Sequence, residues 1–103
     1  MRAVRYYIGT ELDKDNKQIK DIEKKTVEIK RLVALAFGGS TVFNGAGSWR
    51  DNNKDIVNEK ALTVEVLTGA SDKELRKMAG ILRDVFNQES VLMTTQRINS
   101  EFV

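Results

Sequence analysis

The spacing of hydrophobic residues changes several times along this sequence, and the order of these changes is what most constrains the fold. Residues 2–12 are rich in Val, Tyr, Ile and Thr, and Val4, Tyr6 and Ile8 alternate with polar residues, as in a strand. From residue 19 the spacing becomes three to four residues, which predicts an amphipathic helix. Its buried face should hold Ile22, Thr26, Ile29, Val33 and Ala36. Asp15 or Asn16 is the expected N-cap, and Gly38-Gly39 should end the helix.

The second half of the chain repeats the pattern. Residues 40–50 and 55–68 read as two strands joined by a turn at Asp51-Asn52-Asn53-Lys54. Ser71 and Glu74 form a capping box that opens a second helix. The helix buries Leu75, Met78, Ile81, Leu82 and Val85. A last strand is expected over residues 90–97.

The predicted order is therefore β-α-β-β-α-β in one α+β domain spanning residues 1–103. This order favours a ferredoxin-like sandwich, with two helices on one face of a four-stranded antiparallel sheet. The other face would expose side chains or be covered by a second copy of the chain, so we expect a homodimer or higher homo-oligomer. The residues expected on that face are Arg5, Tyr7, Thr63, Glu65 and Leu67.

Composition limits the chemistry. The 103 residues include no His, Cys or Pro. The usual general base, the thiol nucleophile and the commonest zinc ligands are therefore missing. We expect no enzyme, no metal and no cofactor.

The charge and hydropathy patterns argue against duplex nucleic acid and membranes as partners. Seventeen Lys and Arg residues are interleaved with 15 Asp and Glu residues, which is typical of a solvated surface and not of a duplex nucleic-acid binder. The longest apolar run, residues 32–37, is far shorter than the roughly 20 residues of a membrane helix. The first residues lack the hydrophobic region of a signal peptide. We expect a cytoplasmic protein.

Two glycine-rich stretches have alternative interpretations. Residues 37–40 and 44–48 match neither a phosphate-binding loop nor a dinucleotide fingerprint, because the first closes a helix and the second lies within a strand. The structural interpretation is a helix C-cap and a β-bulge. The functional one is that Gly45 and Gly47 allow a ligand or a partner backbone to approach closely.

Several residues are candidate ligand contacts, each with a structural alternative. Trp49 could stack on a ring while Arg50 binds a phosphate, or the two could plug the sheet edge and pair with a carboxylate. Residues 87–90 could cap the second helix, or donate amide and hydroxyl hydrogen bonds at the mouth of a pocket. Arg97 is either an anion contact or solvent-exposed. RNA stacking on Tyr6-Tyr7 is disfavoured, because the strand 61–66 offers no second aromatic residue.

Three segments together resemble known families. They are Gly47-Ser48-Trp49-Arg50, Glu59 before the strand 62–67, and Phe86-Asn87-Gln88-Glu89-Ser90-Val91-Leu92. This succession resembles a family of small uncharacterised bacterial domains. With the opening Arg-x-Tyr-Ile-Gly and the helix ending in Phe-Gly-Gly-Ser-Thr, it is also similar to phage-encoded Thoeris anti-defence sponges.

The sponge resemblance implies a non-enzymatic protein of the infected bacterial cell that sequesters cyclic ADP-ribose-type signals, and in some members cyclic oligonucleotides, at a dimer interface. The ligand-binding positions it implies here are Arg31, Trp49, Arg50, Phe86, Asn87 and Arg97. The alternative is a protein-interaction domain that dimerises or occludes a partner through its sheet face. Carboxylates such as Glu59, Glu65 and Glu89 fall on separate elements, so the sequence does not show whether any two meet.

Overall fold

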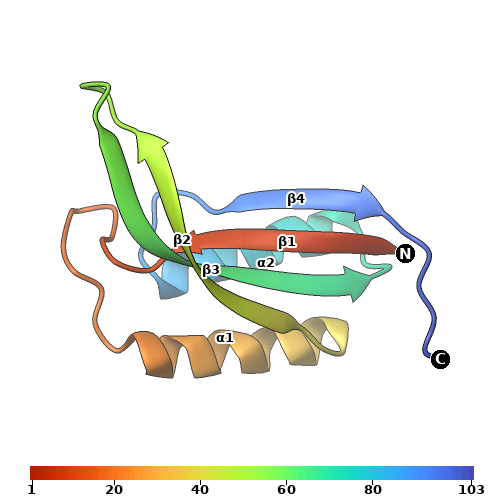
Figure 1. Ribbon diagram of the computed structural model, residues 1–103. Helices are drawn as coiled ribbons and strands as arrows, with labels where there is room; N and C mark the ends of the chain where they lie inside the picture. The colour runs from red at the N-terminus through yellow and green to blue at the C-terminus, as the bar shows by residue number, and fades with distance from the viewer.

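The structure is a computed structural model that describes residues 1–103 (Figure 1). Its elements follow the predicted order, with the last strand beginning two residues later than expected. They are β1 (Arg2–Gly9), α1 (Ile22–Phe37), β2 (Thr41–Arg50), β3 (Ile56–Thr68), α2 (Asp72–Val85) and β4 (Leu92–Arg97).

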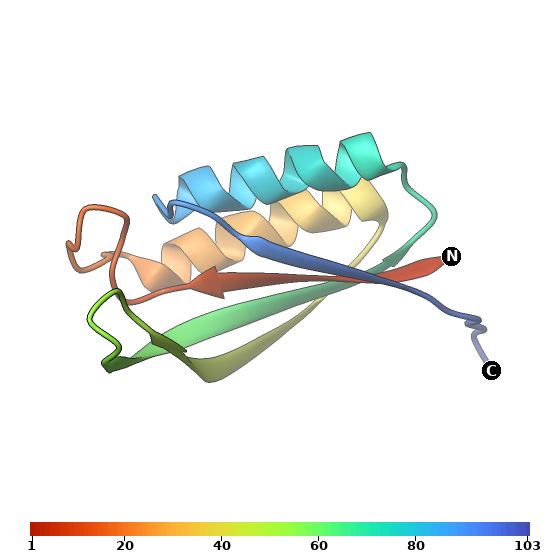
Figure 2. The same cartoon turned by 90° about the horizontal axis from the view of Figure 1, so that it is seen from above.

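The four strands form one antiparallel sheet in the order β2-β3-β1-β4. Both helices lie side by side on one face of this sheet, and the other face is bare (Figure 2). The predicted ferredoxin-like α+β sandwich is confirmed. In this topology the first strand of the chain is a central strand of the sheet, flanked by β3 and β4.

The core lies between the sheet and the helices. Val4, Tyr6 and Ile8 of β1 are almost fully buried, as the alternation in this segment predicts. The Tyr6 hydroxyl donates a 2.8 Å hydrogen bond to the carbonyl oxygen of Leu75 in α2. Burial raises the pKa of Tyr6 to about 12, because the apolar surroundings disfavour the phenolate. The hydroxyl therefore stays protonated and ties the sheet to α2.

The helix ends agree with the sequence except at the start of α1. Gly38 caps α1 with a φ of 89°, and its N–H bonds to the Ala34 carbonyl. The Ser71 hydroxyl accepts a hydrogen bond from the Glu74 N–H at the start of α2. The N-cap of α1 is Asp21, whose side chain makes no capping bond, so the expected cap at residue 15 or 16 is wrong.

The reason is that the polar residues before α1 form a separate turn. Asp13 Oδ1 accepts hydrogen bonds from the backbone N–H groups of Asp15 and Lys17, at 2.8 and 3.0 Å. Leu12 and Gln18 then form an isolated β-bridge. Residues 12–18 therefore form a closed turn of their own, and α1 begins only after it, at Ile22.

The β2–β3 hairpin is long and regular. Its pairing runs without a break from Thr41 opposite Glu65 to Arg50 opposite Ile56. The expected β-bulge at Gly45 and Gly47 is therefore wrong. β1 pairs only with residues 61–68 of β3, so residues 46–50 and 56–60 project beyond it as a two-stranded arm (Figure 1).

The bare sheet face is more hydrophobic than a solvated surface requires. Near its centre, Arg5 Nε donates a 2.7 Å hydrogen bond to Glu65 Oε2, and this contact raises the pKa of Arg5. Around this ion pair the register places large, partly exposed apolar side chains on the same face. They are Tyr7, Phe43, Trp49, Leu67 and Leu92. The residues predicted for this face, Arg5, Tyr7, Thr63, Glu65 and Leu67, lie on it.

Candidate functional site

A hollow of about 730 Å³ lies where the hairpin arm leaves the sheet. The small residues Gly9, Gly47 and Ala61 form its floor. Gly9 of β1 pairs with Ala61 of β3, and Gly47 of β2 pairs with Glu59. A side chain built on Gly47 would meet no atom within 4 Å, so this glycine leaves open space on the sheet surface at that position. The functional interpretation of Gly47, close approach by another molecule, fits this geometry.

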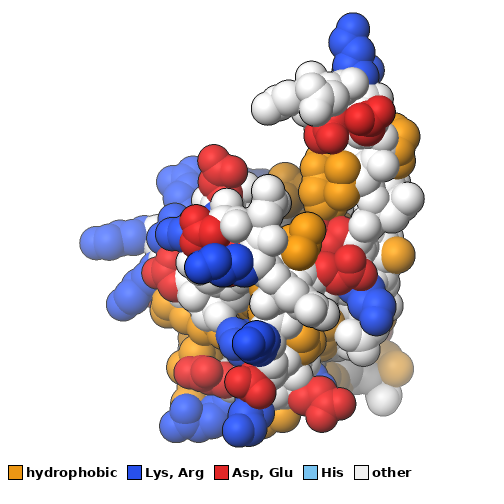
Figure 3. All heavy atoms as spheres, turned by 90° about the vertical axis from the view of Figure 1, so that its left-hand side faces the viewer, with side chains coloured by type: hydrophobic (Ala, Val, Ile, Leu, Met, Phe, Trp, Pro, Cys, Tyr) orange, Lys and Arg blue, Asp and Glu red, His pale blue; other side chains and the backbone are white.

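Trp49 stands on the arm at one side of the hollow. It lies two residues beyond Gly47, and so on the same face of the hairpin. Its side chain is 47% exposed, which leaves the indole surface available for stacking. Figure 3 views this end of the molecule and shows hydrophobic side chains along the projecting hairpin, with acidic side chains next to them.

Glu59 is held in place by the loop after β1. Its Oε1 accepts hydrogen bonds from the backbone N–H groups of Glu11 and Leu12, at 3.3 and 3.4 Å. The other oxygen, Oε2, accepts no hydrogen bond from the protein. A carboxylate anchored through one oxygen can accept hydrogen bonds from a ligand with the other.

The corner between α2 and β4 forms the opposite wall. The helix ends in a Schellman motif, in which the Gln88 N–H bonds to the Arg83 carbonyl and the Asn87 N–H to the Asp84 carbonyl. Asn87 takes the left-handed conformation that this motif requires, with a φ of 48°. The turn directs Gln88, Glu89 and Ser90 to the hollow.

This corner is fastened to the loop after β1. Asn87 Nδ2 donates a 3.1 Å hydrogen bond to Asp13 Oδ2, and Gln88 Nε2 donates a 2.9 Å bond to the Leu12 carbonyl. The backbone N–H of Lys17 and the Asn87 amide hold the pKa of Asp13 below its usual range. The capping interpretation of Asn87 is confirmed.

A second hollow of about 470 Å³ adjoins the first. The two hollows share four lining residues, Trp49, Glu59, Gln88 and Glu89. The indole of Trp49 therefore borders both hollows. Glu59 and Glu89, which are 30 positions apart in sequence, thus meet at one site. No arginine lines either hollow. The site is rich in carboxylate and amide groups, has one lysine in each hollow (Lys60 and Lys14), and carries two aromatic rings, Trp49 and Tyr7.

The six predicted ligand contacts lie in different places. Trp49 is at the hollow. Arg50 follows it on the arm but lines neither space, and it makes no ion pair. Arg31 is exposed on α1, which covers the opposite face of the sheet.

The other three are also separated. The Phe86 ring is 0% exposed and belongs to the core, which corrects its assignment as a ligand contact. Asn87 faces Asp13 in the loop. Arg97 lies at the far end of β4, opposite Arg2.

The sequence did not identify most of the wall. The sequence assigns no role to Glu59 or Glu89, and it places Tyr7 on the open face without linking it to Leu92. The available signal was the register, since Tyr7 pairs with Leu92 and lies two residues before Gly9. No group of three or more acidic residues is placed to hold a metal ion, and no helix is long and apolar enough to cross a membrane.

The fold and site define a small α+β domain with an uncovered sheet face and a hollow at its edge. Residues 4–102 match the family described as "Protein of unknown function (DUF3574)", and the chain belongs to this family. This membership agrees with the resemblance to small uncharacterised domains, and it does not name the sponge family. No curated protein matches the sequence significantly.

Solved structures share the fold at low identity. A phage SAM lyase in complex with S-methyl-5′-thioadenosine aligns with a TM-score of 0.64 and 21% identity, over 92% of this chain and 79% of the lyase. The divalent cation tolerance protein CutA1 from Thermus thermophilus aligns with a TM-score of 0.68 and 10% identity, over 99% and 88%. The periplasmic CutA from Archaeoglobus fulgidus gives 0.67 and 8%, over 99% and 88%.

Proposed function

We propose that this protein binds a small adenosine-containing molecule in the hollow beside Trp49. The observation that carries the proposal is the exposed indole standing next to a floor of glycine and alanine, with the anchored Glu59 carboxylate beside it. The phage SAM lyase of the same fold was solved with a ligand of this class, S-methyl-5′-thioadenosine.

Each part of such a ligand has a partner of suitable chemistry. The indole can stack on a purine ring. The free Oε2 of Glu59 can accept hydrogen bonds from ribose hydroxyls, as carboxylates do in dinucleotide-binding proteins. The side-chain amide oxygen of Gln88, whose N–H groups bond within the protein, and the Ser90 hydroxyl can bond the edge of the base.

The charges of the site favour a neutral or cationic substituent on the ribose. Glu59 and Glu89 line both hollows. Lys60 is the one cation at the first hollow and Lys14 the one at the second, where Glu11, Asp13 and Asp51 add three more carboxylates, so negative charge exceeds positive charge in each. A pyrophosphate in this position would be repelled, because like charges within a few ångströms destabilise each other. Cyclic ADP-ribose, the ligand implied by the sponge resemblance, also contains adenosine. Its pyrophosphate makes it a less suitable ligand for this site than an uncharged or cationic nucleoside.

We further propose that the ligand is held without being changed. The site has no His or Cys, and no nucleophile paired with a base is identified in it. Holding a nucleoside requires only stacking, hydrogen bonds and a closed shape. Recovery of intact ligand from the heat-denatured complex would distinguish holding from cleavage.

Tryptophan fluorescence tests the binding directly, because Trp49 is the only tryptophan of the chain. Titration with S-methyl-5′-thioadenosine should quench the emission and saturate. Cyclic ADP-ribose should bind more weakly, by about tenfold or more if one extra like-charge contact costs on the order of 1.4 kcal/mol. S-adenosylmethionine is the cationic probe.

Substitution of Gly47 provides the matched test. Gly47→Val would fill the open space at that position and should abolish the quenching while the protein stays folded, since valine is favoured in strands. Thr41→Val, on the same face of β2 and outside the hollow, should leave binding unchanged. Equal binding by wild type and Gly47→Val, or no quenching by any adenosine compound, would overturn the proposal.

We also propose that a second copy of the chain covers the part of the open sheet face around Arg5, Glu65 and Leu67, away from the hollow. The face carries both members of the Arg5–Glu65 pair within an apolar surround, so it is complementary to itself about a two-fold axis.

Sedimentation equilibrium tests this assembly. Wild type should sediment as an oligomer. Leu67→Lys places an unpaired charge on the open face, away from the hollow, and should shift the equilibrium to monomer. Val27→Lys, at a more exposed position on α1, is the control and should not shift the equilibrium. A monomeric wild type at high concentration would contradict the assembly without affecting the ligand proposal.

A further inference from the structure

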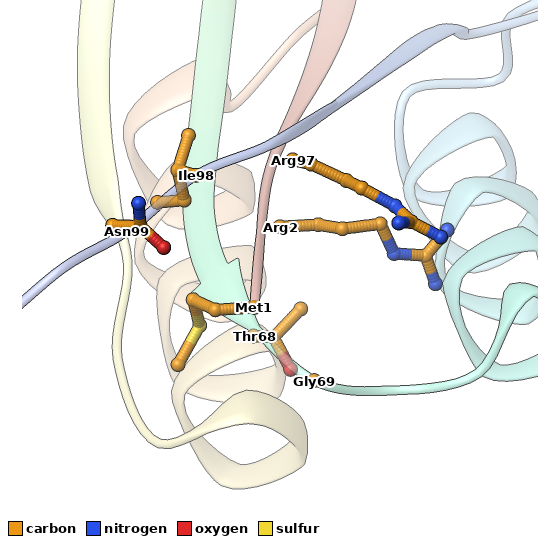
Figure 4. Close-up of a pocket in the computed structure, with 7 residues that line it drawn as sticks. All are labelled: Met1, Arg2, Thr68, Gly69, Arg97, Ile98 and Asn99. Atoms are coloured by element: carbon orange, nitrogen blue, oxygen red, sulfur yellow. The ribbon is translucent and has the colours of Figure 1, made fainter.

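Another cavity, of about 570 Å³, lies at the opposite end of the sheet from the Trp49 hollow. Arg2 of β1 and Arg97 of β4 are direct partners in the antiparallel register there. Figure 4 shows the two side chains running in the same direction, with their guanidinium groups next to each other. Thr68 and Asn99 also line the cavity.

Like charges in directly opposed strand positions destabilise a sheet unless something compensates them. Arg2 is compensated, since it forms an ion pair with Asp72 and donates a 2.7 Å hydrogen bond to the Ala70 carbonyl. The Arg2 guanidinium holds the pKa of Asp72 below its usual range, so that carboxyl stays ionised. Arg97 has no ion pair and no side-chain hydrogen bond in the structure.

The three charged side chains therefore carry a net charge of +1. The Arg2 guanidinium is fixed in position by its two bonds, and Arg97 is left with all of its donors available. A fixed and a free guanidinium side by side are suited to an oxyanion, which accepts parallel N–H bonds from such groups.

We propose that Arg2 and Arg97 form a binding site for a phosphate group. A phosphate fits better than a carboxylate, because it carries more negative charge and has enough terminal oxygens to accept bonds from both neighbouring guanidinium groups at once. The cavity exceeds the volume of inorganic phosphate, so a small phosphate monoester also fits.

This site is separate from the nucleoside hollow. The pair Arg2–Arg97 lies five residues along the strands from the pair Tyr7–Leu92, which corresponds to about 17 Å. The proposal does not depend on the function proposed for Trp49.

The test is a titration of the ¹⁵N-labelled protein with inorganic phosphate, and separately with glycerol 3-phosphate, at constant ionic strength set by chloride. Saturable shift changes should be confined to the amides around Arg97, Thr68 and Asn99. Tighter binding of glycerol 3-phosphate would identify a phosphate monoester as the ligand, and equal binding would identify the free ion.

Substitutions complete the test. Arg97→Gln should weaken phosphate binding by about tenfold, the loss expected from one charge-assisted contact, and Arg97→Lys by less. Arg83→Gln, which removes an exposed arginine paired with its neighbour Asp84, should change nothing. Shift changes that are scattered over the surface, that chloride reproduces, or that titrate with wild-type affinity in Arg97→Gln would overturn the site.

Discussion

The carboxylate of Glu59 occupies the space that a side chain on Gly9 would need: a Cβ at position 9 would lie 2.7 Å from Glu59 Oε1. Only glycine at this point of β1 lets the carboxylate reach the N–H groups of Glu11 and Leu12. The position of a proposed ligand contact therefore depends on the absence of a side chain on the neighbouring strand.

Gly9→Ala should separate binding from stability. The methyl group would displace the end of a flexible side chain, so the free energy of unfolding should change by less than about 1 kcal/mol. Affinity for S-methyl-5′-thioadenosine should fall, because Glu59 loses its fixed position. Urea unfolding and fluorescence titration measure the two effects. Gly39→Ala, where no atom lies within 4 Å, is the control, and unchanged affinity in Gly9→Ala would remove Glu59 from the site.

Asp13→Asn should destabilise the protein at neutral pH and matter less in acid. The folded state lowers the pKa of Asp13, so its contribution is present above the unfolded value of about 4 and is lost as the pH falls through the folded value. The difference in unfolding free energy between wild type and variant should be constant from about pH 7 to 5 and shrink below about pH 4.

Urea unfolding of both proteins across this range measures the difference. Asp15→Asn is the matched control, because the Asp15 carboxylate accepts no hydrogen bond in the structure. A wild-type advantage that persists undiminished at pH 3 would show that the charge of Asp13 is not what fastens the loop.

Tyr6→Phe removes the buried hydrogen bond to the Leu75 carbonyl and should cost about 1 kcal/mol at pH 7. The wild type should also lose stability between about pH 10 and pH 12, since the unfolded phenol ionises at its ordinary value and the folded one only at about 12. The variant should lack this component. Parallel alkaline unfolding curves for the two proteins would contradict a buried, protonated Tyr6.

Phe86→Leu tests the reassignment of this ring to the core. Leucine is smaller, so unfolding should become easier by about 1–2 kcal/mol. Quenching of Trp49 by S-methyl-5′-thioadenosine should keep the wild-type affinity in the folded protein. A loss of affinity without a loss of stability would restore Phe86 as a ligand contact.

The fold was predictable because each segment carries a local signal that agrees with its neighbours. The alternation of Val4, Tyr6 and Ile8 and the Ser71 cap were enough to place β1 and α2. Where a local signal had two uses, the prediction failed. Asp15 and Asn16 are suited to an N-cap but belong to a turn that closes before the N-cap of the helix at Asp21, and Gly45 and Gly47 are suited to a bulge but continue a regular ladder.

The site was less predictable, because it is assembled by pairing between distant segments. Trp49 was singled out by type, since a lone tryptophan beside glycines is conspicuous. Glu59 and Glu89 meet only because β3 passes beside β1 and α2 ends in a left-handed Asn87. The predicted arginines, Arg31, Arg50 and Arg97, lie in three separate places. The type of a side chain indicates what it can bind, but not where the fold places it.

The central place of β1 also determines how the chain must fold. Its partners are residues 61–68 and 92–97, so the first strand cannot complete its ladders until residue 97 is available. Mean contact separation is therefore high, and proteins of this kind fold more slowly than helical bundles of equal size. Until then the apolar side of β1 is exposed. The partly synthesised chain is consequently the form of this protein most prone to aggregation.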